Sequence, residues 1–96
     1  MDTEQSAVDI WQAVIGDLQV QVPKPVFETW LKNTNGVSLE ENAITVAVPT
    51  TFGVEWLERS LYQMVLKTLQ RVTGISMDVR FQVAYQSSPM IRLGSA

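Results

Sequence analysis

The segment from Thr51 to about Thr73 constrains the fold of this chain more than any other part of the sequence. Its apolar residues recur every three or four positions and fall within about 140° of one another on a helical projection, which is typical of an amphipathic α-helix. They are Val54, Leu57, Leu61, Met64, Val65, Leu69 and Val72. A threonine opens the segment and Gly74 follows it, and these residue types are frequent at the two ends of helices. The segment therefore predicts a single long helix with one buried face.

Strand-like alternation of apolar and polar residues lies on both sides of this helix. Residues 37–48 are predicted to form a hairpin with its turn at Glu41-Asn42, and residues 77–84 to form a final strand. The residues expected to face the core are Val37, Leu39, Ile44, Val46 and Val48 in the hairpin and Val79, Phe81 and Val83 in the last strand. Because the last strand has no hairpin partner in the sequence, the long helix has to carry the chain back to the sheet.

The first of two N-terminal helices is predicted from Ser6 to Gln19. Ser6 is a favourable N-cap, and Asp9 stands three positions later, as in a capping box. An apolar stripe of about 160° runs along this helix, although about 100° is enough to face a core. The stripe consists of Ala7, Val8, Trp11, Val14, Ile15 and Leu18, with Ile10 at its edge. We expect most of Trp11 to be buried and the edge around Ile10 to be available to a partner.

A second, shorter helix is predicted over residues 25–33. Pro25 suits its first turn, where the missing N–H costs nothing, and Asn35-Gly36 is expected to end it with a left-handed residue. Its apolar residues are Phe27, Trp30 and Leu31. The predicted order is then α-α-β-β-α-β, an α+β domain of three helices and a three-stranded sheet. We expect this domain to span residues 1–85, and residues 86–96, which lack periodicity, to begin a flexible linker.

The composition excludes most catalytic chemistries. The chain has no cysteine and no histidine, which removes Ser-His and Cys-His nucleophilic sites and nearly every structural zinc site. Phosphate-binding glycine loops and a G-x-S-x-G elbow are also absent from the sequence. The carboxylates are dispersed: Glu40 and Glu41 fall in a turn, and Glu55 can pair with Arg59 on a helix surface. We expect a protein that is not an enzyme and that binds no metal or cofactor in this domain.

Charge and hydropathy bear on partners and location. A formal net charge of −3 and dispersed Lys and Arg residues oppose strong nucleic-acid binding, which depends on a concentrated positive surface. No apolar run approaches the roughly 18 residues of a membrane span, and the acidic first residues have no signal-peptide pattern. We therefore expect a soluble, cytoplasmic protein that does not bind membranes.

Two aromatic residues depart from the pattern of the long helix. Phe52 and Trp56 project to the side opposite its apolar stripe, about 160–200° away on a helical projection, among polar neighbours. Trp56 is expected to pack on the hairpin or on the short helix. Phe52, in the first turn beside Gly53, is either packed or exposed, and it is the better candidate for an apolar residue that another protein covers.

Several motifs, taken in their order along the chain, resemble those of one family. They are Trp11, VFETWL at 26–31, VAVPTTF at 46–52 and VEWLERSL at 54–61. Over roughly residues 8 to 84, the chain resembles the N-terminal domain of the bacterial chromosomal replication initiator DnaA. The resemblance implies a KH-like fold and a non-catalytic interaction hub that forms a weak homodimer, helps load the replicative helicase and receives initiation regulators at the chromosomal origin. It implies an ATP site only in a downstream domain of a longer initiator.

The resemblance also assigns site residues, in two groups. Ile10 and Trp11 match the family's self-association patch on the first helix. The residues that match the helicase- and regulator-binding region are Val26, Thr50, Phe52 and Gly53. Some family members carry an acidic residue at the position of Val26, so the charge role of that residue does not transfer to this chain.

Two other functions remain open on the sequence alone. One is a KH-like module that binds single-stranded nucleic acid. The acidic composition and the lack of a GXXG loop oppose it, so we expect weak or no binding of single-stranded DNA. The other is a free-standing regulator that mimics the initiator domain.

Overall fold

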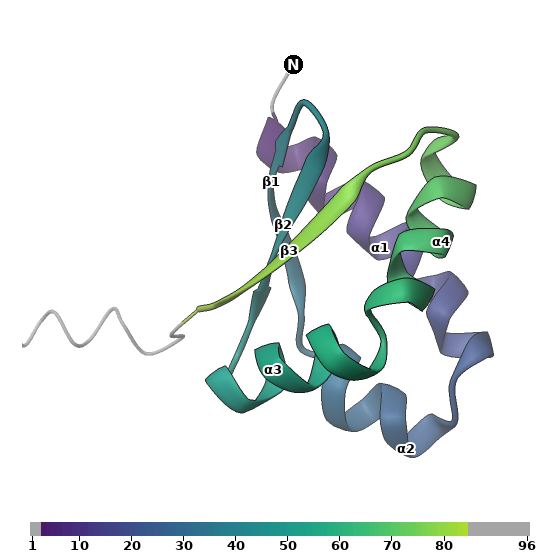
Figure 1. Cartoon of the computed structure of the whole chain (residues 1–96), viewed down its shortest axis with the longest axis vertical. Coiled ribbons are helices and arrows are strands. Elements are labelled where there is room, and N and C mark those ends of the chain that lie inside the picture. The colour runs from purple at the N-terminus through teal and green to yellow at the C-terminus, as the bar shows by residue number, and fades with distance from the viewer. Residues whose placement is uncertain (1–2, 85–96) are drawn as a thin grey trace, which may run out of the picture.

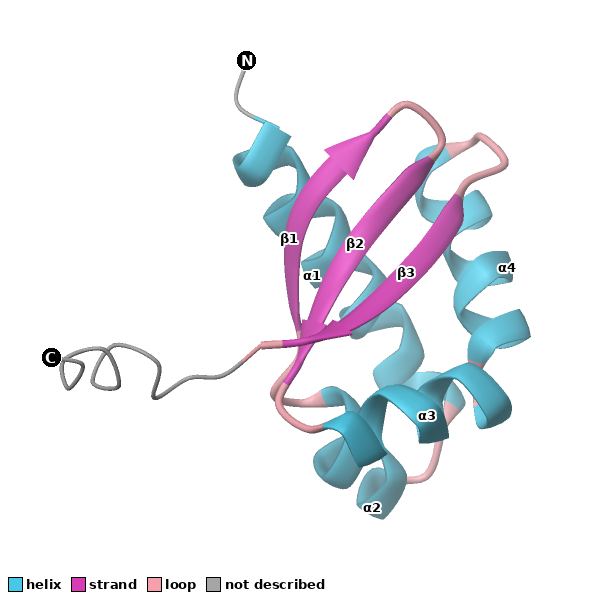
Figure 2. Cartoon of the chain, turned by 60° about the vertical axis from the view of Figure 1, so that its left-hand side comes forward, coloured by secondary structure: helices cyan, strands magenta, loops and turns pink. Residues whose placement is uncertain are grey.

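The computed structural model of the chain describes residues 3–84, so the linker expected from residue 86 lies outside the described residues. Three strands form one mixed sheet, with helices on one face and the other face open (Figures 1 and 2). The strands lie in the order β1 (Asn35–Glu40), β2 (Ala43–Val48) and β3 (Asp78–Val83). β1 pairs with β2 antiparallel, and β2 pairs with β3 parallel. The predicted α+β class and the return of the last strand to the sheet are confirmed.

The first helix, α1 (Thr3–Gln21), is longer than predicted. It begins before Ser6, so Ser6 and Asp9 lie inside the helix and the predicted capping box was wrong. The predicted stripe is confirmed along its centre, where the buried residues are Ala7, Trp11, Val14 and Leu18. Its edges are only partly buried, at Val8, Ile10 and Ile15. The wide stripe thus divides into a core-facing centre and a half-exposed margin.

The short helix after α1 combines two helix types. It combines α2 (Lys24–Val26) with a π-helical turn, η1 (Phe27–Leu31), and Pro25 lies in its first turn as predicted. The Lys32 N–H donates to the Phe27 carbonyl at 2.9 Å, five residues back, which is the π-helical spacing. The sequence therefore located this helix correctly, but a regular α-helix throughout was wrong.

β1 begins at Asn35, so Asn35-Gly36 belongs to a strand and is not the predicted left-handed end of a helix. Gly36 is buried against α1. A Cβ at this position would meet the carbonyl oxygen of Ala7 and lie 2.9 Å from the Cβ of Trp11. The glycine is therefore present because two backbones approach closely here, and not because the chain turns.

The hairpin forms with the predicted turn, because Glu40 pairs with Ala43 across Glu41-Asn42. The register shifts between Gly36 and Ser38, which makes Val37 the extra residue of a bulge. The regular alternation predicted for the first strand was therefore wrong at Val37. β2 is the central strand and is buried along its whole length.

The predicted long helix is two helices, α3 (Thr51–Ser60) and α4 (Tyr62–Thr73), broken at Leu61. Leu61 has φ −121° and ψ 4°, outside the α-helical region. The apolar spacing continues through Leu61 and neither Gly nor Pro marks the break, which is why the sequence predicted one helix. α3 lies across one end of the sheet, and α4 runs in a different direction from α3 (Figure 1). Gly74 ends the segment as predicted, and it does so in the left-handed conformation, with φ 80°.

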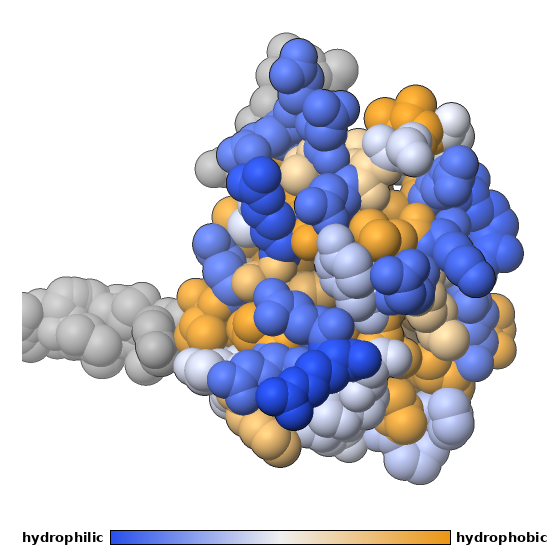
Figure 3. Space-filling view, in the orientation of Figure 1, coloured by the Kyte–Doolittle hydropathy of each residue, from blue (hydrophilic) through white to orange (hydrophobic). Residues whose placement is uncertain are grey.

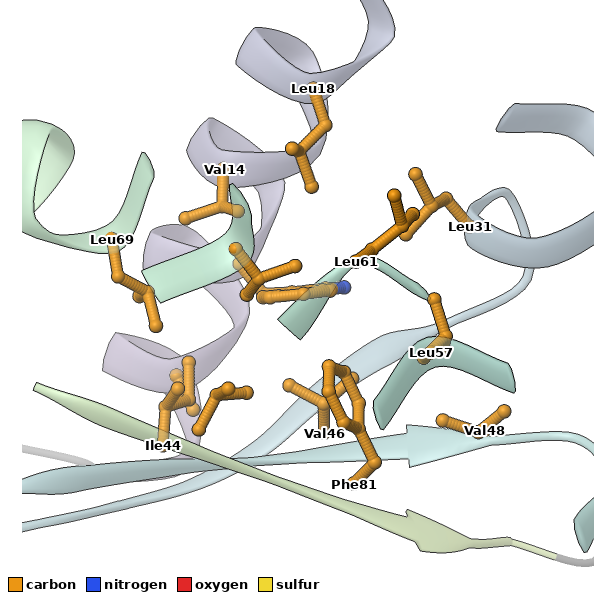
Figure 4. Packing of buried hydrophobic residues seen from close by; sticks show 14 of the residues in the cluster. Val14, Leu18, Leu31, Ile44, Val46, Val48, Leu57, Leu61, Leu69 and Phe81 are labelled. Atoms are coloured by element: carbon orange, nitrogen blue, oxygen red, sulfur yellow. The ribbon is translucent and has the colours of Figure 1, made fainter. Parts of the chain in front are cut away.

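The core lies between the helices and the sheet, where side chains from α1, β2, α3 and α4 converge (Figure 4). The completely buried aliphatic side chains include Val14, Leu18, Leu31, Ile44, Val46, Leu57, Val65 and Leu69. The break at Leu61 leaves the stripe intact, because Leu57, Leu61 and Val65 are all buried on its two sides. Within residues 3–84, none of the helices combines the length and the continuous apolar character that a bilayer crossing requires.

Candidate protein-interaction surface

Three aromatic rings from two separate segments meet where η1 lies beside α3. Trp30 and Trp56 stack with their ring centroids 4.3 Å apart and their planes 6° apart. Phe52 lies against Trp30 with 5.5 Å between centroids and an angle of 60°. We call Trp30, Phe52 and Trp56 the aromatic cluster. Its two tryptophans are partly buried, whereas Phe52 is 67% exposed. The cluster therefore presents the ring of Phe52 to solvent, next to the stacked tryptophan pair.

The aromatic cluster accounts for the two rings that depart from the apolar stripe of α3. Trp56 packs on Trp30 of the short helix, which confirms one of the two packing sites expected for it. The alternatives for Phe52 are resolved in favour of exposure. The part played by Trp30 was not predicted, because its spacing from Phe27 and Leu31 assigned it to the core. The available signal was the pair of large rings off the stripe of α3, which needed a packing partner from another segment.

The start of α3 holds Phe52 in place through its two neighbours. The Thr50 hydroxyl accepts a hydrogen bond from the Gly53 N–H at 2.9 Å, which caps the helix. Gly53 is buried, and a Cβ there would lie 2.9 Å from Cγ1 of Val48 at the end of β2. Thr50 and Gly53 therefore fix the direction in which the first turn leaves the sheet, and Phe52 projects from that turn.

Val26 lies on the short helix that carries Trp30. It precedes Trp30 by four residues, a spacing that places two side chains on one helical face. It is partly buried and packs against the core. An apolar side chain thus stands where some members of the resembled family carry a carboxylate. In the face drawn in Figure 3, hydrophilic and hydrophobic side chains lie next to one another.

The self-association residues expected on α1 are placed differently from each other. Trp11 is only 1% exposed, and its indole Nε1–H donates to the Thr34 hydroxyl at 2.9 Å. Its ring also meets Phe81 edge to face, with 6.4 Å between centroids. Ile10 is partly buried and is the more accessible of the pair. Trp11 therefore has a core position and offers almost no surface to a second copy, while its assignment to self-association stays a prediction.

The titratable groups form one notable pair, away from the aromatic cluster. The Tyr62 hydroxyl donates to Asp78, which also accepts from the Val79 N–H at 2.8 Å. The hydrogen bond from Tyr62 is the main cause that lowers the pKa of the Asp78 carboxyl, and the one from the Val79 N–H lowers it further. The same hydrogen bond is the main cause that raises the pKa of Tyr62. The pair joins α4 to β3.

The described residues offer no gathered set of metal-binding side chains. Across residues 3–84, no three His, Cys, Asp or Glu side chains lie close enough together to hold a metal ion. The ion pairs found there are Arg71 with half-buried Asp17, at 3.2 Å, and Arg80 with Glu40, both exposed, at 3.4 Å. The features that stand out for binding are therefore apolar.

Comparison with protein-family models agrees with the motifs and with this geometry. The model described as the DnaA N-terminal domain matches residues 8–71, which is more than half of the chain. The matched range includes most of α1, the short helix, the hairpin, α3 and most of α4, and with them all six expected site residues. The chain belongs to the DnaA N-terminal domain family.

Proposed function

We propose that this domain of a replication initiator is a non-catalytic protein-interaction module, which docks the replicative helicase and initiation regulators on the aromatic cluster and Val26. Membership of the family supports the role in replication initiation. The single observation that carries the docking site is the exposure of Phe52, at 67%, on top of the Trp30–Trp56 stack. A large ring exposed to water costs free energy that a partner recovers by covering it.

The geometry of the cluster suits a docking site of small area. Phe52 is supported by Trp30 beneath it, so little side-chain freedom remains to be lost when a partner binds. Aromatic side chains held in this way are typical of the few residues that carry most of the binding free energy in protein interfaces. The site is a modest apolar surface, and its affinity in the full protein would depend on several such contacts acting together.

The test compares Phe52→Ala with the wild-type chain in a pull-down of the replicative helicase. We expect binding to be lost while the free energy of unfolding falls by only about 1 kcal/mol, because the ring is mostly exposed and its main packing partner is one indole. Ile75→Ala is the matched control, since Ile75 is also a large exposed apolar residue, at 51%, but lies beyond the end of α4. Undiminished helicase binding by Phe52→Ala would overturn the proposal.

We propose further that Ile10 and the half-exposed margin of α1 mediate weak self-association. Ile10→Gln should lower the fraction of dimer in sedimentation equilibrium at high concentration and should leave thermal stability nearly unchanged. Val20→Gln is the matched control, because Val20 lies on the same helix and is 82% exposed. If both variants remain as dimeric as the wild type, or if Val20→Gln alone dissociates, the assignment to Ile10 fails.

A nucleic acid is a weaker candidate for the aromatic cluster. Proteins that bind single-stranded nucleic acids stack bases on exposed aromatic rings and also have a positively charged groove. This chain has a net charge of −3, and its basic residues are dispersed. We therefore propose that the cluster recognises protein partners, and that no cofactor takes part.

A further inference from the structure

β3 is an edge strand whose outer side is unpaired. It bonds to β2 through the N–H groups of Asp78 and Ala84, which donate to the carbonyls of Asn42 at 2.7 Å and Val48 at 2.9 Å. Backbone groups alternate in direction along a strand. The N–H and C=O groups of the intervening odd-numbered residues, Val79, Phe81 and Val83, therefore point away from β2 and toward the open edge.

One end of this edge is already closed by a side chain. The Val79 N–H donates to the Asp78 carboxylate, which Tyr62 holds from α4. Among the described residues, no comparable acceptor meets the N–H of Phe81 or Val83 on the outer side. Side chains that close edges are a common protection against added strands. Here that protection covers the start of β3 and leaves its second half available.

A groove of about 370 Å³ runs beside the edge from Val79 to Phe81, where the closed start of β3 meets its open part. Its lining residues are Glu58, Tyr62, Val79, Arg80 and Phe81. Val79, Phe81 and the Tyr62 ring supply its apolar lining, and Arg80 lies beside them. Arg80 is engaged with Glu40 at 3.4 Å, whereas Glu58 forms no ion pair in the described part of the chain. The groove therefore offers one uncompensated carboxylate beside apolar side chains.

We propose that the edge of β3 binds an extended peptide segment of a partner protein, which adds as a fourth strand at Phe81 and Val83 and places a Lys or Arg side chain beside Glu58. An extended backbone is required because only a strand can satisfy the row of outward N–H and C=O groups. The charge of Glu58 selects a basic residue, and the apolar lining selects apolar residues two positions on either side of it, since alternate side chains share one face. This site is separate from the aromatic cluster and does not rest on the function proposed for that cluster.

The test uses the full 96-residue chain, labelled with nitrogen-15, and a capped probe peptide of sequence Val-Thr-Lys-Thr-Val-Thr. We expect the peptide to shift the NMR amide signals of Phe81 and Val83 and to slow their hydrogen exchange. Two matched peptides separate the two sources of affinity. One replaces Lys by Glu and should bind more weakly, and the other carries N-methyl groups on alternate residues and should not bind as a strand.

The protein variant Glu58→Gln should weaken binding of the lysine probe by about two- to fivefold, the range measured for exposed ion pairs. Because Glu58 is exposed, its replacement should leave the NMR spectrum elsewhere unchanged. The proposal is overturned if the lysine and glutamate peptides bind equally well, if the N-methylated peptide retains full affinity, or if no shifts occur at Phe81 and Val83. Shifts confined to the aromatic cluster would likewise overturn it, since they would place the peptide on the other surface.

Discussion

Trp11 is a buried residue of α1 whose side chain contributes both packing and a hydrogen bond to the core. Its indole fills the core and its N–H bonds to Thr34, whose own hydroxyl donates to the Leu31 carbonyl at 2.7 Å. Trp11 thereby connects α1 to the segment that leads from η1 into β1. Ile10, the preceding residue, points toward the margin of the same helix.

Trp11→Ala should lower the free energy of unfolding by about 3–5 kcal/mol, because it removes a large buried ring and leaves a cavity. Trp11→Phe should cost less, about 1–3 kcal/mol, since it mainly removes the hydrogen bond to buried Thr34. Urea unfolding of both variants measures these losses. A loss of dimer in Trp11→Ala alone would report this damage to the fold, whereas equal stability of Trp11→Ala and wild type would contradict the buried position.

The surroundings of a single residue could be predicted from the sequence only where they depend on residues nearby in the chain. The departure of Phe52 and Trp56 from the apolar stripe followed from one helical projection, because both residues lie on α3. The projection did not decide between packing and exposure for Phe52. The role of Trp30 did not follow from such a projection, because it depends on the meeting of η1 with α3. A residue whose neighbours lie far along the chain cannot be assigned from its own periodicity.

Among the elements, the contact between α1 and β1 depends on a glycine with no Cβ. Gly36→Ala would press a methyl group against the Ala7 carbonyl and the Trp11 Cβ, so α1 would have to move away from the strand. We expect a loss of about 1–3 kcal/mol in the free energy of unfolding, as is usual for overpacking.

Gly16→Ala is the matched control, because Gly16 lies inside α1 and an added Cβ there meets nothing within 4 Å. Alanine favours the helix by roughly 0.5–1 kcal/mol over glycine, so this variant should be more stable than the wild type. Thermal unfolding followed by circular dichroism measures both shifts. A neutral Gly36→Ala would show that α1 and β1 are not in such close contact.

The existence and order of the elements were predictable, but their interruptions were not. Alternation and helical spacing located the three strands, α1, the short helix and the α3–α4 segment. The break at Leu61 and the π-helical turn of η1 keep the apolar residues on the core side, so they leave the pattern unchanged. The close approach of α1 at Gly36 is a tertiary feature, which the local pattern does not show, and the bulge at Val37 follows directly after it.

In the whole molecule, the Tyr62–Asp78 hydrogen bond links α4 to the last strand, β3. It also makes the free energy of unfolding depend on pH. The pKa of Asp78 is lowered in the folded state, so its contribution is fully present above the unfolded pKa, about 3.9, and is lost as pH falls through the folded value. Glu58 and Arg80, the other charged groups beside the pair, favour neutral Tyr62 and ionised Asp78 respectively.

Tyr62→Phe removes the main cause of this lowered pKa. The variant should be less stable than the wild type at neutral pH, and the difference should shrink as pH falls below about 4. Urea unfolding of the two proteins across this range measures the difference. A constant difference at all pH values would show that Tyr62 contributes by packing and not by stabilising the carboxylate.

The stacking of Trp30 on Trp56 also has a spectroscopic consequence. Of the three tryptophans, two lie in the aromatic cluster and the third is sealed in the core. Indole fluorescence shifts to shorter wavelength when water is removed from the ring. A ligand that covers the pair alters the emission of two of the three fluorophores, while Trp11 changes only when the chain unfolds. The domain thus carries its own optical probes, which distinguish occupancy of this surface from loss of the native state without any added label.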